Sequence, residues 1–107
     1  MKALVVVLAV LLTSCGIVSP PKTPTGPATG KVGQKLTFQT KGTDPLNVHE
    51  YMFDWGDETA PVWKSNTEQS HVFTTPRTFT IRAKEKCPAE LFVTDWSKAK
   101  TVKVLPK

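Results

Sequence analysis

The sequence is poor in the residues and patterns that several large protein classes need. Histidine occurs only twice, at His49 and His71, and no serine lies in a sequence context that marks it as a nucleophile. The longest apolar run, residues 3–12, is far shorter than the roughly 20 residues that a membrane-spanning helix requires. No segment repeats apolar residues at the spacing of an amphipathic helix. These absences argue against an enzyme, a transmembrane helix and a helical fold.

The N-terminus has the composition of a signal peptide. Lys2 supplies a positive charge, residues 3–12 form an apolar stretch of suitable length, and two small residues precede Cys15. The alternative is a buried N-terminal strand or helix, but the rest of the chain lacks the apolar surplus to cover one. We therefore expect residues 1–14 to be a signal peptide that is removed.

Residues 12–15, Leu-Thr-Ser-Cys, resemble the lipobox of bacterial lipoprotein precursors. In that family the cysteine thiol receives a diacylglycerol before cleavage, and a thiolate is a good nucleophile for this step. The resemblance implies that Cys15 carries two or three acyl chains such as palmitate, enough for a stable membrane anchor. Gly16 resembles the sorting pattern of lipoproteins sent to an outer membrane. The alternative is an ordinary secretory signal followed by an incidental cysteine.

Residues 15–30 are expected to form the lipidated cysteine and a tether, since residues 16–30 hold four prolines and three glycines. Extended proline-rich chain at about 3.1 Å per residue would lift a domain about 40 Å from a bilayer. The chain has a net charge of +5, and loss of Lys2 lowers it to +4. The scattered basic residues are typical of a solvated surface that favours anionic lipid or glycan rather than nucleic acid.

Short alternating segments follow from residue 31 onward. Apolar and polar residues alternate in 36–40, 51–55, 77–84 and 101–104, and turn-forming residues separate these segments. Such period-two runs, rich in threonine, valine and aromatic residues, are typical of half-buried strands. The sequence therefore predicts an all-β domain over residues 31–107, arranged as an antiparallel sandwich or barrel with a small core.

Residues 53–57, Phe-Asp-Trp-Gly-Asp, resemble the strand-ending signature of the PKD domain, a family named after the polycystic kidney disease protein. Further matches follow in the family's order at Trp63, residues 70–73, residues 75–81 and residues 95–97. The resemblance implies an Ig-like β-sandwich of about seven short strands. It also implies a non-catalytic domain that contacts proteins or carbohydrates.

The signature has a direct structural interpretation. Phe53 and Trp55 are two residues apart, so both face the core, and Asp54 points the other way. Gly56 permits a backbone conformation closed to other residues. Asp57 is expected to accept hydrogen bonds from the turn, as Asx turns do, rather than to bind a ligand.

The chain departs from the family at two positions. Glu58 replaces the final glycine of the signature, and Arg77 replaces the glycine that usually follows the proline. If these turns require positive φ, each replacement costs roughly 1 kcal/mol.

No metal or cofactor is expected. Five carboxylates are candidates for a calcium site, but calcium needs six to eight oxygen ligands and their spacing shows no such loop. They are Asp44, Asp54, Asp57, Glu58 and Asp95. A catalytic grouping of Ser70, His71 and Asp57 has little support, because His71 occupies a family position usually explained by packing.

Three other residues leave alternatives open. Trp63 and Trp96 are possible surface contacts, as a platform for sugars, or simply cover the edge of the sandwich. Cys87 is expected to be a small core residue, with a reactive thiol or an intermolecular disulfide as the alternatives. If Cys15 is acylated, it is not available to Cys87.

The sequence thus predicts a lipoprotein that displays a binding or spacer domain in the cell envelope, on the periplasmic or extracellular side. The partners expected are the membrane, through the anchor, and an envelope protein or glycan. The alternatives are a structural subunit of an envelope or secretion complex, and a small exclusion or immunity lipoprotein that blocks an envelope receptor.

Overall fold

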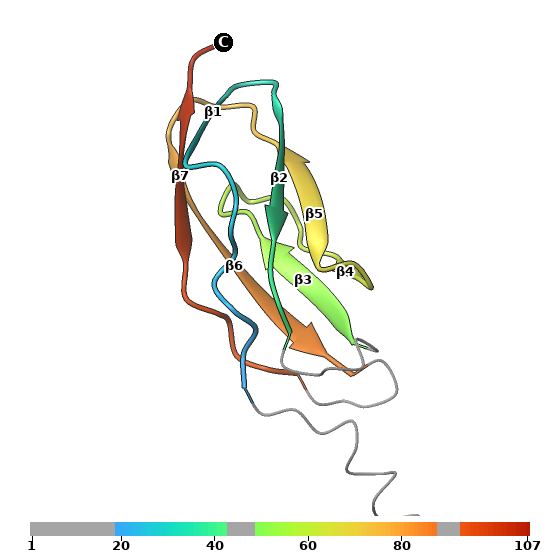
Figure 1. Ribbon diagram of the computed structural model, residues 1–107. Coiled ribbons are helices and arrows are strands. Elements are labelled where there is room, and N and C mark those ends of the chain that lie inside the picture. The colour runs from blue at the N-terminus through green and yellow to red at the C-terminus, as the bar shows by residue number, and fades with distance from the viewer. Residues whose placement is uncertain (1–18, 43–48, 88–92) are drawn as a thin grey trace, which may run out of the picture.

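A computed structural model describes residues 19–42, 49–87 and 93–107 (Figure 1). The predicted signal peptide, Cys15 and Asp44 lie outside these residues. Every regular element in the described part is a strand, and none of it forms a helix long and apolar enough to cross a membrane. The strands are β1 (Thr29–Lys31), β2 (Lys35–Gln39), β3 (Glu50–Asp54), β4 (Trp63–Lys64), β5 (Glu68–Val72), β6 (Thr78–Lys86) and β7 (Lys100–Leu105).

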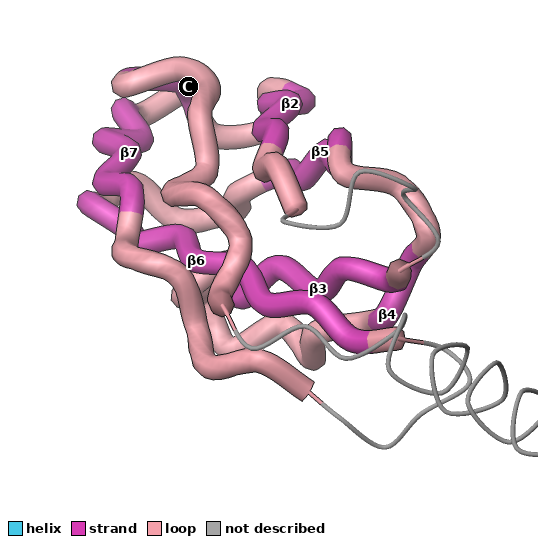
Figure 2. The backbone as a smooth tube through the Cα atoms, turned by 60° about the horizontal axis from the view of Figure 1, so that its bottom comes forward, coloured by secondary structure: helices cyan, strands magenta, loops and turns pink. Residues whose placement is uncertain are grey.

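The seven described strands form two sheets. One sheet has the order β1-β7-β6-β3-β4, and the other consists of β2 and β5. Figure 2 shows the β2–β5 pair lying over the larger sheet, with the two layers facing each other. All neighbouring strands run antiparallel except β1 and β7, which are parallel. The prediction of an all-β, Ig-like sandwich is confirmed.

The core lies between the two sheets and follows the alternation of the strands. β6 is the longest strand, and its residues are alternately exposed and buried over most of its length. β2 and β7 show the same alternation. The buried side chains include Leu36, Phe38, Phe53, Trp55, Phe73, Phe79, Ile81, Ala83, Val102 and Val104. Period-two patterning therefore places one face of each strand in the core.

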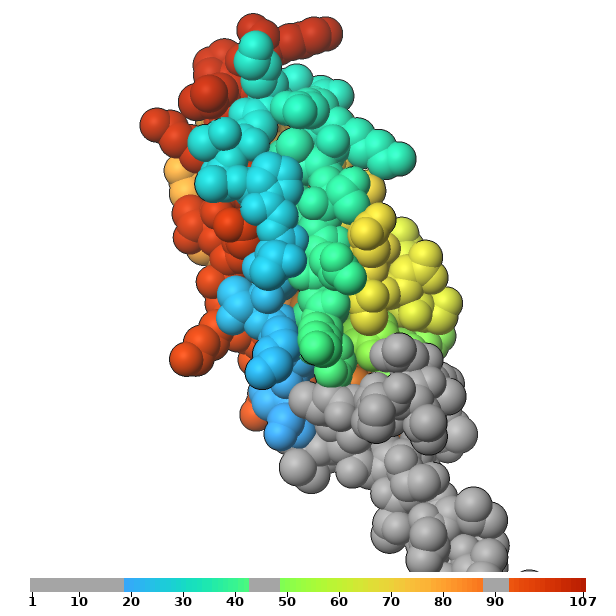
Figure 3. Space-filling view, viewed as in Figure 1, coloured from blue at the N-terminus to red at the C-terminus, as the bar shows by residue number. Residues whose placement is uncertain are grey.

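The domain begins earlier than the predicted boundary at residue 31. The backbone N–H of Lys22 donates to the carbonyl of Lys41 at 2.9 Å, and Thr25 and Gln39 exchange backbone hydrogen bonds of 2.7 and 2.9 Å. Pro21 and Pro24 are buried. Figure 3 shows this segment, in blue, lying along the surface between β7 and β2. We call residues 20–28 the N-terminal strap.

The strap and β1 show that residues 22–31 pair with the folded domain, whereas the predicted tether ran over residues 15–30, of which 15–18 lie outside the described residues. Extended proline-rich chain has the geometry of an edge strand, and proline is tolerated there because an edge does not require every N–H. The same composition therefore suits a spacer or a strap, and only the pairing partner decides between them. Here the partners are Gln39, Lys41 and the last strand, β7.

Candidate functional site

The signature residues build a continuous stack of rings in the core. Phe53 stacks on Trp55 with centroids 5.0 Å apart, and Trp55 stacks on His71 at 4.7 Å with only 5° between the planes. His71 then meets Phe73 edge-on at 4.7 Å, and Phe73 stacks on Phe79 at 4.4 Å. Offset and edge-to-face contacts of this kind are favourable beyond the area they bury. The stack gives His71 a packing role between two aromatic rings.

Asp57 lies beside this stack and fixes the imidazole of His71. Its Oδ2 is 2.6 Å from Nε2 of His71, and its Oδ1 accepts a hydrogen bond from the backbone N–H of Thr59 at 3.1 Å. Burial alone would raise the pKa of Asp57, but the hydrogen bonds from His71 and Thr59 and the imidazole charge outweigh burial and lower this pKa below its ordinary value of 3.8. The carboxylate therefore acts as the acceptor that closes a turn.

Ser70 is not part of this arrangement. Its hydroxyl lies 2.7 Å from the hydroxyl of Thr37 on the neighbouring strand β2, whereas the Nε2 atom of His71 is directed at Asp57. The structure thus brings together two of the three residues of the weakly supported catalytic grouping. What it assembles is a carboxylate–imidazole pair without the serine.

Glu58 is held in a left-handed backbone conformation, with φ at 70°, close to Gly56 with φ at 74°. A Cβ on Gly56 would lie 2.5 Å from the carbonyl oxygen of Thr80. The turn therefore does require the conformation that the family fills with glycine, and Glu58 adopts it under strain. Arg77 is not among the described residues with positive φ, so its position makes no such demand.

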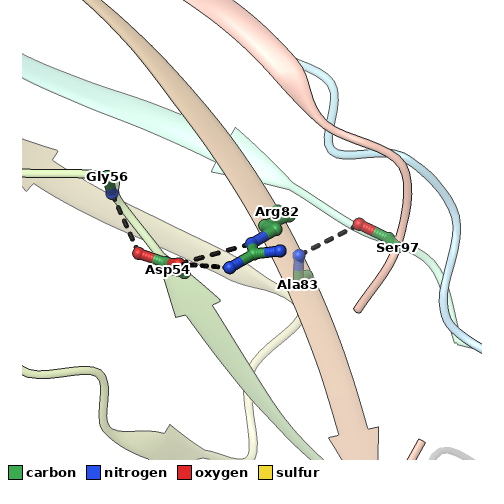
Figure 4. A network of polar contacts seen from close by, with 5 residues as sticks. All are labelled: Asp54, Gly56, Arg82, Ala83 and Ser97. Carbon is green, nitrogen blue, oxygen red and sulfur yellow. Dashed lines mark hydrogen bonds and ion pairs between the residues drawn. The ribbon is translucent and has the colours of Figure 1, made fainter. Parts of the chain in front are cut away.

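Asp54 faces outward from β3, as its place in the strand predicts. Figure 4 shows its carboxylate between Gly56 and Arg82: Oδ1 accepts from the Gly56 N–H at 3.0 Å, and Oδ2 lies 3.2 Å from Nη2 of Arg82. On the next stretch of β6, the backbone N–H of Ala83 donates to the hydroxyl of Ser97 at 3.0 Å. These contacts join the signature turn, β6 and the segment before β7 into one polar network.

Trp63 and Trp96 lie over the outer face of the larger sheet and are partly exposed. Trp63 on β4 is opposite Met52 on β3, which is in turn opposite Lys84 on β6. The Nζ atom of Lys86 is 4.8 Å from the Trp63 ring centroid. Lys84 and Arg82 lie 4.4 and 4.8 Å from the Trp96 ring centroid. These cations occupy ring surface on which a sugar would otherwise stack.

The carboxylates considered for calcium are dispersed. Asp54 pairs with Arg82, and Asp57 pairs with His71. Within residues 19–42, 49–87 and 93–107, no group of three or more histidine, cysteine, aspartate or glutamate side chains is arranged to hold a metal ion.

A buried ionisable pair was not foreseen from the sequence. His49 Nδ1 lies 2.6 Å from Oε2 of Glu85, and neither side chain is exposed. The signal for Glu85 was available, because the alternation through Phe79, Ile81 and Ala83 places the next inward position at residue 85. The predicted strand stopped at residue 84 and so missed it.

Cys87 is buried, with 2% of its surface exposed, and its sulfur is disulfide-bonded. The sequence contains one other cysteine, Cys15, which lies outside the described residues. A Cys15–Cys87 bridge and a thioether-linked lipid on Cys15 exclude each other chemically, because both use the same sulfur. The disulfide at Cys87 therefore competes with lipidation of Cys15, and the chemical state of Cys15 in the mature protein decides between the two.

An open hollow lies between the N-terminal strap and the segment that precedes β7. It encloses about 380 Å³ and is lined by residues 20–23 and 96–98. Trp96 forms an aromatic wall, Pro20 and Pro21 supply apolar surface, and Lys22 and Lys98 supply positive charge. This hollow is not predictable from the sequence, because a free tether over the same residues leaves it without one of its walls.

Comparisons with known proteins agree with the fold. The structure is similar to the PKD domain of an M14-like peptidase from Thermoplasmatales archaeon SCGC AB-540-F20, with a TM-score of 0.60 and 27% sequence identity over 85% of this chain and 100% of that one. It is also similar to the PKD domain of the human VPS10 domain-containing receptor SorCS2, with a TM-score of 0.55 and 15% identity over 85% of this chain and 79% of that one. No protein-family model and no curated protein matches the sequence. The chain thus contains a PKD-like domain with an Ig-like fold.

Proposed function

We propose that this chain is a lipoprotein of the bacterial cell envelope that displays a non-catalytic PKD-like binding or spacer domain. The observation that carries the proposal is the order of features along the chain. A signal-peptide-like segment ends in Leu-Thr-Ser-Cys, and the PKD-like sandwich begins only a few residues later. A chain that is exported, lipidated and folded in this order would present the sandwich at a membrane surface.

The polar clusters of the domain support a binding or spacer role over an enzymatic one. Asp57 closes a turn and orients His71, Asp54 joins Arg82 to the signature turn, and Ser97 accepts from the β6 backbone. Each of these side chains contributes to the fold through a partner within the domain. The partner we propose is another envelope protein or a glycan, and no nucleic acid.

The test is mass spectrometry of the mature protein isolated from membranes. The expected product begins at Cys15 and carries a diacylglycerol thioether, with an additional acyl chain on its amino group in organisms that add one. A Cys15→Ala variant should lose the lipid and leave the detergent phase in detergent partitioning, whereas a Cys87→Ala control should stay lipidated.

Two results would contradict the proposal. One is a mature chain cleaved elsewhere with an unmodified Cys15. The other is a peptide that contains Cys15 disulfide-linked to Cys87, detected without reduction, because that bridge leaves no sulfur for the lipid.

A further inference from the structure

The strap limits how far the domain can move from a lipid on Cys15. Backbone hydrogen bonds fix the chain from Lys22 onward, and the Thr40 hydroxyl donates to the Lys22 carbonyl at 2.6 Å. The seven residue steps from Cys15 to Lys22 span at most about 25 Å when fully extended. This is shorter than the spacing of about 40 Å that a free proline-rich tether through residue 30 would allow.

The hollow lies at this constrained end of the domain. Residues 20–23 form one of its walls, so it is adjacent to the point where the chain enters the fold. In Figure 1 the strap, in blue, and the orange-red segment before β7 run together at the lower end, whereas the C-terminus is at the opposite end. An anchor on Cys15 would therefore bring the hollow, rather than the C-terminal end, close to the bilayer.

The chemistry of the hollow suits the interfacial region of an anionic membrane. Trp96 is partly exposed, and tryptophan rings favour the headgroup level because they combine an apolar body with an N–H donor. Lys22 and Lys98 are exposed at the hollow, and long basic side chains can extend their charges to lipid phosphates. Among the described residues, none of those that line the hollow is a carboxylate that would oppose an anion.

Two further cations, Arg82 and Lys84, add to the positive potential around the Trp96 ring. Lys84 and Arg82 contact the Trp96 ring, so positive charge lies on the sheet side of the indole as well as at Lys22 and Lys98. Arg82 is partly neutralised by Asp54 at 3.2 Å. An indole ring in contact with Arg82 and Lys84, in a hollow that Lys22 and Lys98 also line, is a suitable contact for a phosphate group that has apolar carbon attached to it.

We propose that the hollow formed by the strap and residues 96–98 docks on the bilayer that holds the anchor, with Trp96 at headgroup level and Lys22 and Lys98 contacting the phosphates of anionic phospholipids. This inference rests on the proposed lipidation of Cys15. Docking would fix the orientation of the domain and direct its C-terminal end away from the membrane.

The experiment uses the mature lipidated chain, reconstituted into vesicles of phosphatidylcholine alone or of phosphatidylcholine mixed with phosphatidylglycerol. Lipids with a nitroxide on the headgroup quench nearby tryptophans, and co-flotation with the vesicles reports the anchor separately. Trp96→Phe is compared with the matched control Trp63→Phe, since Trp63 is also partly exposed but lies on the edge strand β4 and does not line the hollow. The melting temperature of each variant confirms that it is folded.

In the anionic vesicles we expect nitroxide lipids to quench tryptophan fluorescence. The Trp96→Phe variant should lose this quenching, and the Trp63→Phe variant should keep it. The double variant Lys22→Gln and Lys98→Gln should lower the ratio of docked to undocked protein about 30-fold, because each basic residue near an anionic surface contributes about fivefold. Both lysines are exposed, so this variant tests the charge without disturbing the core.

Four outcomes would overturn the inference, and they can be told apart. In one, the protein floats with the vesicles but shows equal quenching in both lipid mixtures, and in another it floats and shows the same quenching in both tryptophan variants. Either result contradicts the docking and leaves the proposed anchor intact. Protein that fails to float contradicts the anchor and with it the docking. If soluble polygalacturonate shields Trp96 from acrylamide while nitroxide lipids do not quench it, the hollow binds an anionic glycan instead.

Discussion

The imidazole of His49 and the carboxylate of Glu85 lie 2.6 Å apart, and both side chains are completely buried. Glu85 occupies an inward position on β6, where the neighbouring inward positions are held by apolar residues. Removing one partner of a buried ionisable pair takes away the opposite charge that stabilises the other in a medium of low dielectric constant. This pair therefore has a larger influence on stability than the contacts on the surface.

We expect Glu85→Ala to lower the free energy of unfolding by about 3–5 kcal/mol, as measured by urea denaturation. Glu50→Ala is the matched control, because Glu50 is 3.8 Å from Lys86 and both side chains are nearly one-third exposed. Its effect should stay within about 1 kcal/mol. Equal losses in the two variants would show that the buried pair has no special role.

Asp57 should make stability depend on pH at the acid end. Its pKa is lower in the folded protein, so its contribution is present above the unfolded pKa and is lost as the pH falls through the folded pKa. We expect Asp57→Asn to cost about 1.5–3 kcal/mol near neutral pH, the range for a hydrogen bond to a charged group. The difference in the free energy of unfolding between the wild-type protein and Asp57→Asn should shrink below a pH of about 4, near the unfolded pKa of aspartate. A difference that is constant from neutral to acid pH would contradict this assignment.

The signature turn should respond in opposite directions to two glycine substitutions. Glu58 has φ at 70°, so Glu58→Gly should raise the free energy of unfolding by about 0.5–1 kcal/mol, after allowing for the greater freedom of glycine in the unfolded chain. Gly56→Ala should be destabilising, because its Cβ would meet the Thr80 carbonyl oxygen at 2.5 Å. Thermal melts of both variants measure these changes in stability. A loss of stability in Glu58→Gly would show that Glu58 is not strained.

Gly30 tests whether β1 belongs to the domain. A Cβ at this position would lie 2.6 and 2.8 Å from the two terminal methyl carbons of Leu36, which is in the core. We expect Gly30→Ala to cost about 1–3 kcal/mol by overpacking, whereas the exposed control Ala28→Gly should change stability by less than about 0.5 kcal/mol. If Gly30→Ala leaves the free energy of unfolding unchanged, the interpretation of this segment as a free tether is restored.

The strands whose patterns are local could be predicted from the sequence. The alternating segments 36–40, 51–55, 77–84 and 101–104 correspond to β2, β3, β6 and β7 with shifts of one or two residues. Their amphipathic faces are encoded within a few neighbouring residues. The resemblance to PKD domains added the way these strands are arranged, which the alternation could not supply.

The features that were missed depend on partners distant in sequence. β1 is only three residues long and is defined by its pairing with β7, more than 70 residues later. The hollow requires the strap to lie beside Trp96, and His49 pairs with Glu85 across 36 positions. No local pattern carries this information, since composition fixes only which conformations a segment tolerates.

The parallel pairing of β1 with β7 has a mechanical consequence. The register joins Thr29 to Lys103 and Lys31 to Leu105, so the first and last strands lie side by side and run in the same direction. Tension that pulls the two ends of the chain apart would act along both strands and load their interstrand hydrogen bonds in shear, all at once. A domain connected in this way resists stretching between its ends more strongly than one whose terminal strands are peeled apart bond by bond.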